Sequence, residues 1–319
     1  MTPMRAEAPL AEYRGERPPA PQWFADALAK TPVRTMVEAC GGRVETLAWG
    51  PQGAPGLLFL HGNGAHADWW SFIAPFFSEE RRVVAMSLSG MGGSDWREDY
   101  STYGFVDEVQ AVADQTGLLA SGRQPVFVGH SMGAAIALAC AGRFGEQLEA
   151  AVLVDPPFRT PERMRQWRDR RSQEPPRTFP KRFYKDLPAA LSRFRFLPPQ
   201  TSDHPYIIDH IARASLQETA EGWTWRFDPA LWSKMTFSDL SPVLADPKCP
   251  IALIHGDRSR LADVHDLAHM WSTAPQGTPV VMIPDADHHL MVDQPLAFVA
   301  ALRGLLAGWP RGRELEQAR

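Results

Sequence analysis

Pro125-Val126-Phe127-Val128 is followed at once by Gly129-His130-Ser131-Met132-Gly133, and then by Ala-Ala-Ile-Ala-Leu at residues 134–138. A G-x-S-x-G pentapeptide between a buried strand and a helix is typical of a tight turn that exposes its serine, because larger neighbours than glycine would clash there. The helix after Ser131 would direct its positive end at negative charge developing beside the serine. We interpret Ser131 as a candidate nucleophile, with a purely structural turn as the alternative.

Other short apolar runs predict the rest of a sheet. They occupy residues 56–60, 83–86, 151–154, 251–254 and 280–283, in addition to 125–128. Strands this short and this uniformly apolar suit a parallel sheet covered on both faces. Helical patterns at residues 105–120, 132–144 and 295–307 lie between or after them, which favours βαβ units and an α/β fold.

The alternation of strand and helix breaks once, between Asp155 and Pro250. This stretch carries arginine and aromatic residues, many in helical spacing, and no comparable apolar run. Part of it must be helices with ordinary apolar faces. An insertion of this length would also form a helical cap over the carboxyl ends of the strands, where open α/β sheets bind ligands.

We therefore expect five segments along the chain. Residues 1–32 are rich in proline, alanine and charge, and predict an N-terminal arm that is extended or partly disordered. The two parts of the core are expected at 33–155 and 243–310, separated by the cap at 156–242. Residues 311–319 are expected to form a C-terminal tail.

Composition excludes several classes of partner. The 319 residues are enough for a sizeable core, and a net charge of -4 gives no indication of a nucleic-acid or anionic-membrane partner. No apolar run approaches the roughly 20 residues that span a bilayer, and the first residues do not resemble a secretory leader. Three widely spaced cysteines suggest buried free thiols in a reducing compartment, so we expect a cytoplasmic protein. The sequence implies no metal and no organic cofactor, and leaves the oligomeric state open.

With two further segments, the serine pentapeptide resembles the α/β-hydrolase superfamily over residues 35–308, the cap excepted. His61-Gly62-Asn63-Gly64 resembles the H-G-x-x-G segment that follows the third strand. Residues 87–94 are similar to the family's D-x-x-G-x-G-x-S loop, although Ser87 replaces the usual aspartate. The resemblance implies a mostly parallel eight-stranded sheet with helices on both faces and a helical cap inserted after strand six.

The resemblance also assigns an oxyanion hole and a base. Two backbone N–H groups, those of Asn63 and Met132, would hold the oxyanion. The family's histidine lies seven residues before the proline that opens the last helix, which is Pro295 here, and this position is His288. Because His289 is adjacent, a metal-binding pair is the other interpretation, but two sequential histidines do not easily face one ion.

The acid is harder to assign, because this chain departs from most relatives. They carry it three residues after the glycine that ends the following strand, and this position is Ser259, which cannot stabilise an imidazolium as a carboxylate does. Asp155, Asp257 and Asp263 are the available replacements. Asp155 matches the alternative acid site after the sixth strand in relatives such as haloalkane dehalogenases and lactone-cleaving hydrolases, although a turn-capping role would also explain it. We favour Asp155 and keep Asp257 as the alternative acid.

A serine nucleophile narrows the chemistry that the resemblance implies. Haloalkane dehalogenases and epoxide hydrolases need a carboxylate at that position, so we expect a serine hydrolase that cleaves a small carboxylic ester through an acyl-enzyme. Lactone, amide or C–C substrates are alternatives, and the competing class is a non-catalytic ligand-binding protein on the same fold. In the cap, Arg193 and Arg195 could meet a substrate carboxylate, or simply lie on a solvated helix face.

Overall fold

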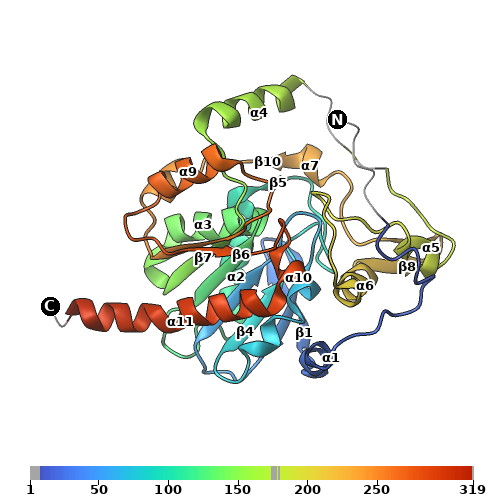
Figure 1. The fold of residues 1–319 in the computed structure, drawn as a ribbon, viewed down its shortest axis with the longest axis horizontal. Helices are drawn as coiled ribbons and strands as arrows, with labels where there is room; N and C mark the ends of the chain where they lie inside the picture. The colour runs from blue at the N-terminus through green and yellow to red at the C-terminus, as the bar shows by residue number, and fades with distance from the viewer. Residues whose placement is uncertain (1–7, 174–177, 179, 318–319) are drawn as a thin grey trace.

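One eight-stranded sheet organises the chain, which the computed structural model describes at residues 8–173, 178 and 180–317 (Figure 1). The strand order is β1-β2-β4-β3-β6-β7-β11-β12. Strands β1 and β2 pair antiparallel, as do β2 and β4, and every later pairing is parallel. The bounds of the strands are Val33–Ala39, Gly42–Trp49, Gly56–Leu60, Arg82–Met86, Val126–His130, Ala150–Val154, Ile251–Gly256 and Val280–Ile283 for β1, β2, β3, β4, β6, β7, β11 and β12.

Helices cover both faces of this sheet (Figure 1). Side chains of α2 (Thr102–Gln115), α3 (Met132–Phe144) and α9 (Val264–Thr273) share one buried apolar cluster with the sheet. A second cluster contains residues of α1 (Gln22–Ala29) and α11 (Pro295–Gln317), so these helices lie on the opposite face. The smaller core elements are η1 Ala67–Trp70, η2 Ala74–Phe76, η3 Gly145–Gln147, β5 Tyr100–Ser101, α8 Ser241–Ala245 and α10 Leu290–Asp293.

The α/β class and the mostly parallel sheet are confirmed. Each apolar run predicted as a strand forms one, with ends within two residues of the prediction. The hairpin of β1 and β2 was not located from the sequence. In β1 only Val37 and Ala39 are buried, so this edge strand has no continuous apolar run to reveal it.

The inserted segment, residues 156–242, contains more than helices. Its helices are α4 (Pro161–Gln173), α5 (Leu187–Leu191), α6 (Pro205–Ala214) and α7 (Leu231–Lys234). The expectation of a purely helical segment missed the antiparallel hairpin of β8 (Leu216–Thr219) and β9 (Gly222–Trp225). It also missed β10 (Met235–Thr236), which pairs with β5 of the core.

The prediction of an extended or partly disordered arm is wrong for residues 8–32. They contain α1, and Leu10 and Phe24 are buried because both join the core cluster. Helix α11 continues through Gln317, into the residues that we assigned to a tail. Cys140 and Cys249 are buried as expected, whereas Cys40 is exposed. Within the described residues, no helix has both the length and the apolarity needed to cross a membrane.

Candidate active site

Ser131 occupies a strained turn between β6 and α3. Its φ of 53° lies in the left-handed region that a non-glycine residue rarely adopts. The flanking glycines make the turn possible, since a Cβ on Gly129 would lie 2.1 Å from the carbonyl oxygen of Gly133. A Cβ on Gly133 would lie 2.5 Å from the carbonyl oxygen of Leu60. The turn therefore requires glycine on both sides of the serine.

Asp155 directly follows β7 and is only 3% exposed. Its Oδ2 atom lies 2.6 Å from His288 Nδ1, and the Ser259 hydroxyl donates to the same oxygen at 2.6 Å. His255 Nδ1 lies 3.2 Å from the other oxygen, Oδ1. Burial alone would raise the pKa of Asp155, but the hydrogen bonds from His255 and His288 outweigh it and lower the pKa to about 2. Asp155 is therefore a carboxylate at neutral pH, in contact with the histidine that we predicted as the base.

The other two acid candidates are engaged elsewhere. Asp257 is exposed and accepts a hydrogen bond from the Ala286 N–H at 3.2 Å. Asp263 caps the N-terminus of α9 and forms an ion pair with Arg163 at 2.5 Å. The structure thus brings Asp155 to His288, and gives the carboxyl groups of Asp257 and Asp263 other partners.

Ser131 and His288 both line one cavity of about 370 Å³. Asn63 and Met132, the residues predicted for the oxyanion hole, line it as well. The inserted segment supplies much of the remaining wall, including Pro157, Phe158, Arg159, Met164, Trp167, Arg168, Leu197, Pro198, Trp232, Met235 and Phe237. The cavity therefore lies between the carboxyl ends of the strands and the inserted segment.

Two more histidines surround His288. His130 Nε2 lies 2.9 Å from the His288 carbonyl oxygen, and burial, reinforced by the charge of His288, lowers the pKa of His130 to about 3. The His289 ring packs against Trp69 and Phe196, with ring centres 5.2 and 5.0 Å apart. Burial lowers the pKa of His289 well below its usual value, so both neighbours are neutral at pH 7. Sequence reasoning missed His130, although it occupies the variable position just before the serine.

These three histidines are also the place where a metal could bind. Among the described residues, His130, His288 and His289 bring potential ligand atoms within 4.8 Å of one another. The sequence indicated only the adjacent pair, His288 and His289, and gave no sign that His130 lies beside them. However, His288 Nδ1 is already bonded to Asp155, and His130 Nε2 is bonded to the His288 carbonyl. An ion would have to compete with the groups that orient His288.

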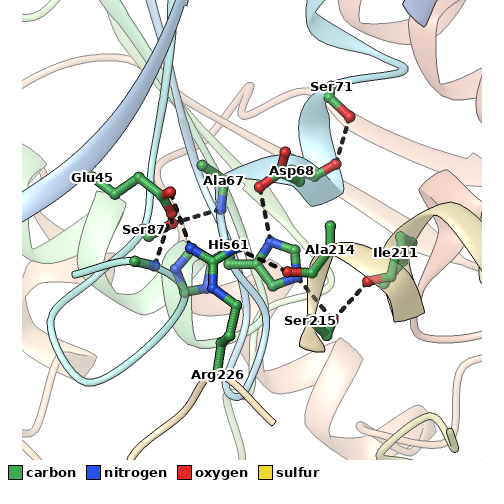
Figure 2. Close-up of polar contacts among 12 residues, drawn as sticks. Glu45, His61, Ala67, Asp68, Ser71, Ser87, Ile211, Ala214, Ser215 and Arg226 are labelled. Carbon is green, nitrogen blue, oxygen red and sulfur yellow. Dashed lines mark hydrogen bonds and ion pairs between the residues drawn. The ribbon is translucent and has the colours of Figure 1, made fainter. Parts of the chain in front are cut away.

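A buried polar network connects Glu45, Ser87 and Ala67 (Figure 2). The Ser87 hydroxyl donates to Glu45 Oε2 at 2.8 Å and accepts from the Ala67 N–H at 3.0 Å. Glu45 also pairs with Arg34 at 2.5 Å and with Arg226 of the inserted segment at 3.2 Å. A glutamate from β2 thus provides a carboxylate beside the loop in which Ser87 replaces the usual aspartate. Sequence reasoning found the replacement but not this carboxylate.

The same network attaches the inserted segment to the core. His66 Nε2 lies 2.8 Å from the Ser215 hydroxyl, and Ser71 Oγ lies 2.7 Å from His210 Nε2. The Ser215 hydroxyl donates to the Ile211 carbonyl, as Figure 2 shows. Helix α6 and the residue that follows it are therefore hydrogen-bonded to the core at both ends of η1.

The sheet order, the strained serine turn and the histidine–carboxylate contact can be compared with known proteins. The family model described as "Alpha/beta hydrolase family" matches residues 57–302. The chain belongs to this family. The expectations of an α/β-hydrolase fold and of a hydrolase are confirmed.

Named relatives of this hydrolase share most of its length. Esterase Rv0045c of Mycobacterium tuberculosis (strain ATCC 25618 / H37Rv) is 26% identical over 287 residues, which are 86% of this chain and 90% of that protein. A crystal structure of the same esterase has a TM-score of 0.64 and 24% identity, and covers 96% of this chain and 99% of that one. The structure of E-2-(acetamidomethylene)succinate hydrolase has a TM-score of 0.71 and 20% identity, with 86% and 99% covered. At these identities the two structures establish the fold alone.

Proposed function

We propose that this chain is a serine hydrolase that cleaves a small carboxylic ester through an acyl-enzyme. Ser131 is the nucleophile, His288 is the general base, and Asp155 orients and stabilises the imidazolium. The backbone N–H groups of Asn63 and Met132 hold the oxyanion.

The observation that carries the proposal is the 2.6 Å contact between His288 Nδ1 and Asp155 Oδ2. A carboxylate at Nδ1 holds a proton on that nitrogen and leaves Nε2 to accept the proton of the serine. Ser131 and His288 line the same cavity, which supports a proton transfer from the serine hydroxyl to the imidazole. The ionised state of Asp155 offsets the positive charge that His288 acquires.

The reaction proceeds in two halves. Ser131 attacks the ester carbonyl as His288 takes its proton, and His288 then returns the proton to the departing alcohol. Water, deprotonated by His288, next cleaves the acyl-enzyme and releases the acid. Negative charge on the carbonyl oxygen in each half is stabilised by the two backbone donors, a contribution of a few kcal/mol per donor.

An ester is favoured as substrate because the relative matching 86% of this chain is named an esterase. We further propose that residues 156–242 act as a cap that limits the size of the substrate, since they supply much of the cavity wall. The largely apolar side chains among them, such as Phe158, Trp167 and Trp232, suit an apolar acyl or aryl group.

The test is hydrolysis of p-nitrophenyl esters from acetate to laurate, with S131A as the control. We expect turnover by the wild type that depends on acyl length, and a loss of roughly 10⁴-fold or more in S131A. An organophosphonate should add once to the wild type and not to S131A. Hydrolysis that survives in S131A, or no hydrolysis of any ester, would overturn the proposal.

A further inference from the structure

His255 interrupts an otherwise apolar strand. It lies in β11, where the residues before it, 251–254, are all apolar and buried, and it is itself only 1% exposed. Burying an imidazole costs free energy unless its nitrogens find hydrogen-bond partners, so an apolar side chain would suit this position better on packing grounds alone. The contacts of His255 must therefore explain why a histidine occupies it.

Asp155 is the polar partner of this side chain. His255 Nδ1 lies 3.2 Å from Asp155 Oδ1, whereas the other ring nitrogen, Nε2, is buried and has no hydrogen-bond partner within residues 8–173, 178 and 180–317. Because a carboxylate can only accept, Nδ1 must carry the proton and donate it. The hydrogen-bonding capacity of the ring is thus directed to the candidate acid.

Strand pairing brings the two residues together. Strands β7 and β11 run parallel with Val154 opposite Ile254, and the Asp155 N–H donates to the Ile254 carbonyl at 2.8 Å. The φ of Asp155 is 43°, in the left-handed region that a non-glycine residue rarely adopts. Such a strained conformation persists only where the surrounding contacts hold it. His255 supplies one of these contacts from the neighbouring strand.

The carboxylate of Asp155 is held through both of its oxygens. Ser259 Oγ and His288 Nδ1 each lie 2.6 Å from Oδ2. Among the side chains that the structure describes, His255 is the one that donates to Oδ1. The terminal torsion of an aspartate has a broad range, so contacts at one oxygen alone would leave the carboxylate free to rotate. Without His255, Oδ1 would also be a buried, charged acceptor with no donor.

We infer that His255 is a positioning residue of the proposed reaction, which fixes the Asp155 carboxylate through Oδ1 so that Oδ2 faces His288. It acts through Asp155 alone and does not line the cavity that contains Ser131. Burial raises the pKa of Asp155, and the hydrogen bond from His255 is the largest of the contacts that lower it, to about 2. His255 therefore also helps to keep the acid ionised.

This inference rests on the proposed function, so S131A is measured beside three variants of His255. H255L has no donor and fills a similar volume. H255N places an amide N–H near the position of Nδ1, whereas H255Q places it near that of Nε2. We would measure kcat and KM for p-nitrophenyl butyrate per active site, counted with an organophosphonate, so that inactive protein does not enter the rate.

We expect H255L to lower kcat by roughly tenfold to hundredfold, because a hydrogen bond to a charged group is lost. KM should stay within about threefold, since His255 does not touch the substrate. H255N should restore kcat to within about threefold of the wild type, and H255Q should resemble H255L.

The acid limb of the kcat/KM profile is the second readout. Without the donor from His255, the Asp155 carboxylate is more basic and stabilises the imidazolium of His288 more strongly. The acid limb of H255L should then shift to higher pH, by roughly half a unit to one unit, and that of H255N should not. A residue that only packs in the core would change stability without moving this limb.

Other titratable groups near the pair are the same in every variant. His130 and His289 lie beside His288, and Asp287 is close enough to Asp155 for the two negative charges to raise the pKa of Asp287, in addition to the effect of burial. A shift of the acid limb in H255L alone would thus come from position 255.

The matched control is H265L, which makes the same substitution at an exposed histidine of α9 that lines neither cavity. It should leave kcat and the acid limb unchanged. Wild-type kcat in H255L, or equal losses in H255L and H255N, would overturn the positioning role. If H255L did not fold, equal kcat values for H255N and H255Q would overturn it. Hydrolysis by S131A, or none by the wild type, would overturn the proposed function and this inference with it.

Discussion

Two regions of the molecule are held in position by different kinds of contact. One is the strand-end cluster of Ser131, Asp155 and His288, and the other is the inserted segment at 156–242. In the cluster, each residue follows a strand or precedes a helix of the core, and parallel strands bring their carboxyl ends to one edge. In the inserted segment, position depends on side-chain contacts such as His210 with Ser71. Regular backbone pairing thus places the candidate catalytic groups, whereas individual side-chain contacts shape the cavity beside them.

The largest expected effect is on the cluster. D155N should lower kcat by about 10⁴-fold, because the amide cannot hold the same tautomer of His288 or offset its charge. D257N should change kcat by less than threefold, since Asp257 is exposed and contacts the Ala286 N–H. Steady-state kinetics on one p-nitrophenyl ester measures both. Normal turnover in D155N with loss in D257N would reverse the assignment.

The second prediction concerns the ion pair between Glu45 of the core and Arg226 of the inserted segment. E45A leaves Arg226, and in part Arg34, without their buried partner, and removes the acceptor of the Ser87 hydroxyl. We expect a loss of roughly 3 kcal/mol in the free energy of unfolding, measured in urea. The control is E79A, which breaks the exposed pair of Glu79 with Lys30 and should leave the urea midpoint nearly unchanged. Equal urea midpoints for E45A and E79A would mean that the buried contacts of Glu45 contribute no stability.

The third prediction concerns pH. Burial lowers the pKa of His210 to about 4, below its usual value of 6.5. As the pH falls, His210 therefore binds a proton in the unfolded chain before it does so in the folded protein. This difference lowers the free energy of unfolding by roughly 2 kcal/mol between pH 7 and pH 5. H210N should reduce the difference in unfolding free energy between pH 7 and pH 5 by that amount. An unchanged pH dependence in H210N would contradict the assignment.

The smallest expected effect is for a variant in which the carboxylate beside His288 is supplied from position 259 in place of position 155. In a D155S/S259D variant, the carboxylate would come from the loop after β11, the position that the family resemblance assigns to the acid. Because Ser259 Oγ lies 2.6 Å from Asp155 Oδ2, we expect about tenfold recovery of kcat over D155S alone. D155S/D257N is the control and should show no recovery. A double variant no better than D155S would show that the acid cannot work from position 259.

The strands at the centre of the sheet could be predicted in detail because they are buried on both faces, and uniform burial leaves continuous apolar runs. Strand β3 was predicted to the residue for this reason. Strand β12 was also predicted to the residue from its apolar run, although this edge strand is largely exposed. The contact of Asp155 with His288 was expected from the family resemblance. Their catalytic roles remain predictions.

The features that the sequence did not reveal depend on partners far apart in the chain. Glu45 meets Ser87 only because β2 and β4 pair antiparallel in a register that sets Thr46 opposite Met86. No local pattern encodes that register. The β8–β9 hairpin was missed because each strand has only four residues, of which one is buried, so neither forms an apolar run.

The hydrogen bond between Ser259 and Asp155 suggests how the position of the acid could change during evolution. A lineage that acquired aspartate at 259 while keeping Asp155 would hold two carboxyl groups at hydrogen-bonding distance. Such a pair shares one proton, because two adjacent negative charges strongly raise one of the two pKa values. The intermediate would still carry one carboxylate beside His288. An ancestor could therefore have transferred the acid from one strand end to the other in two single-residue steps, with no generation lacking it.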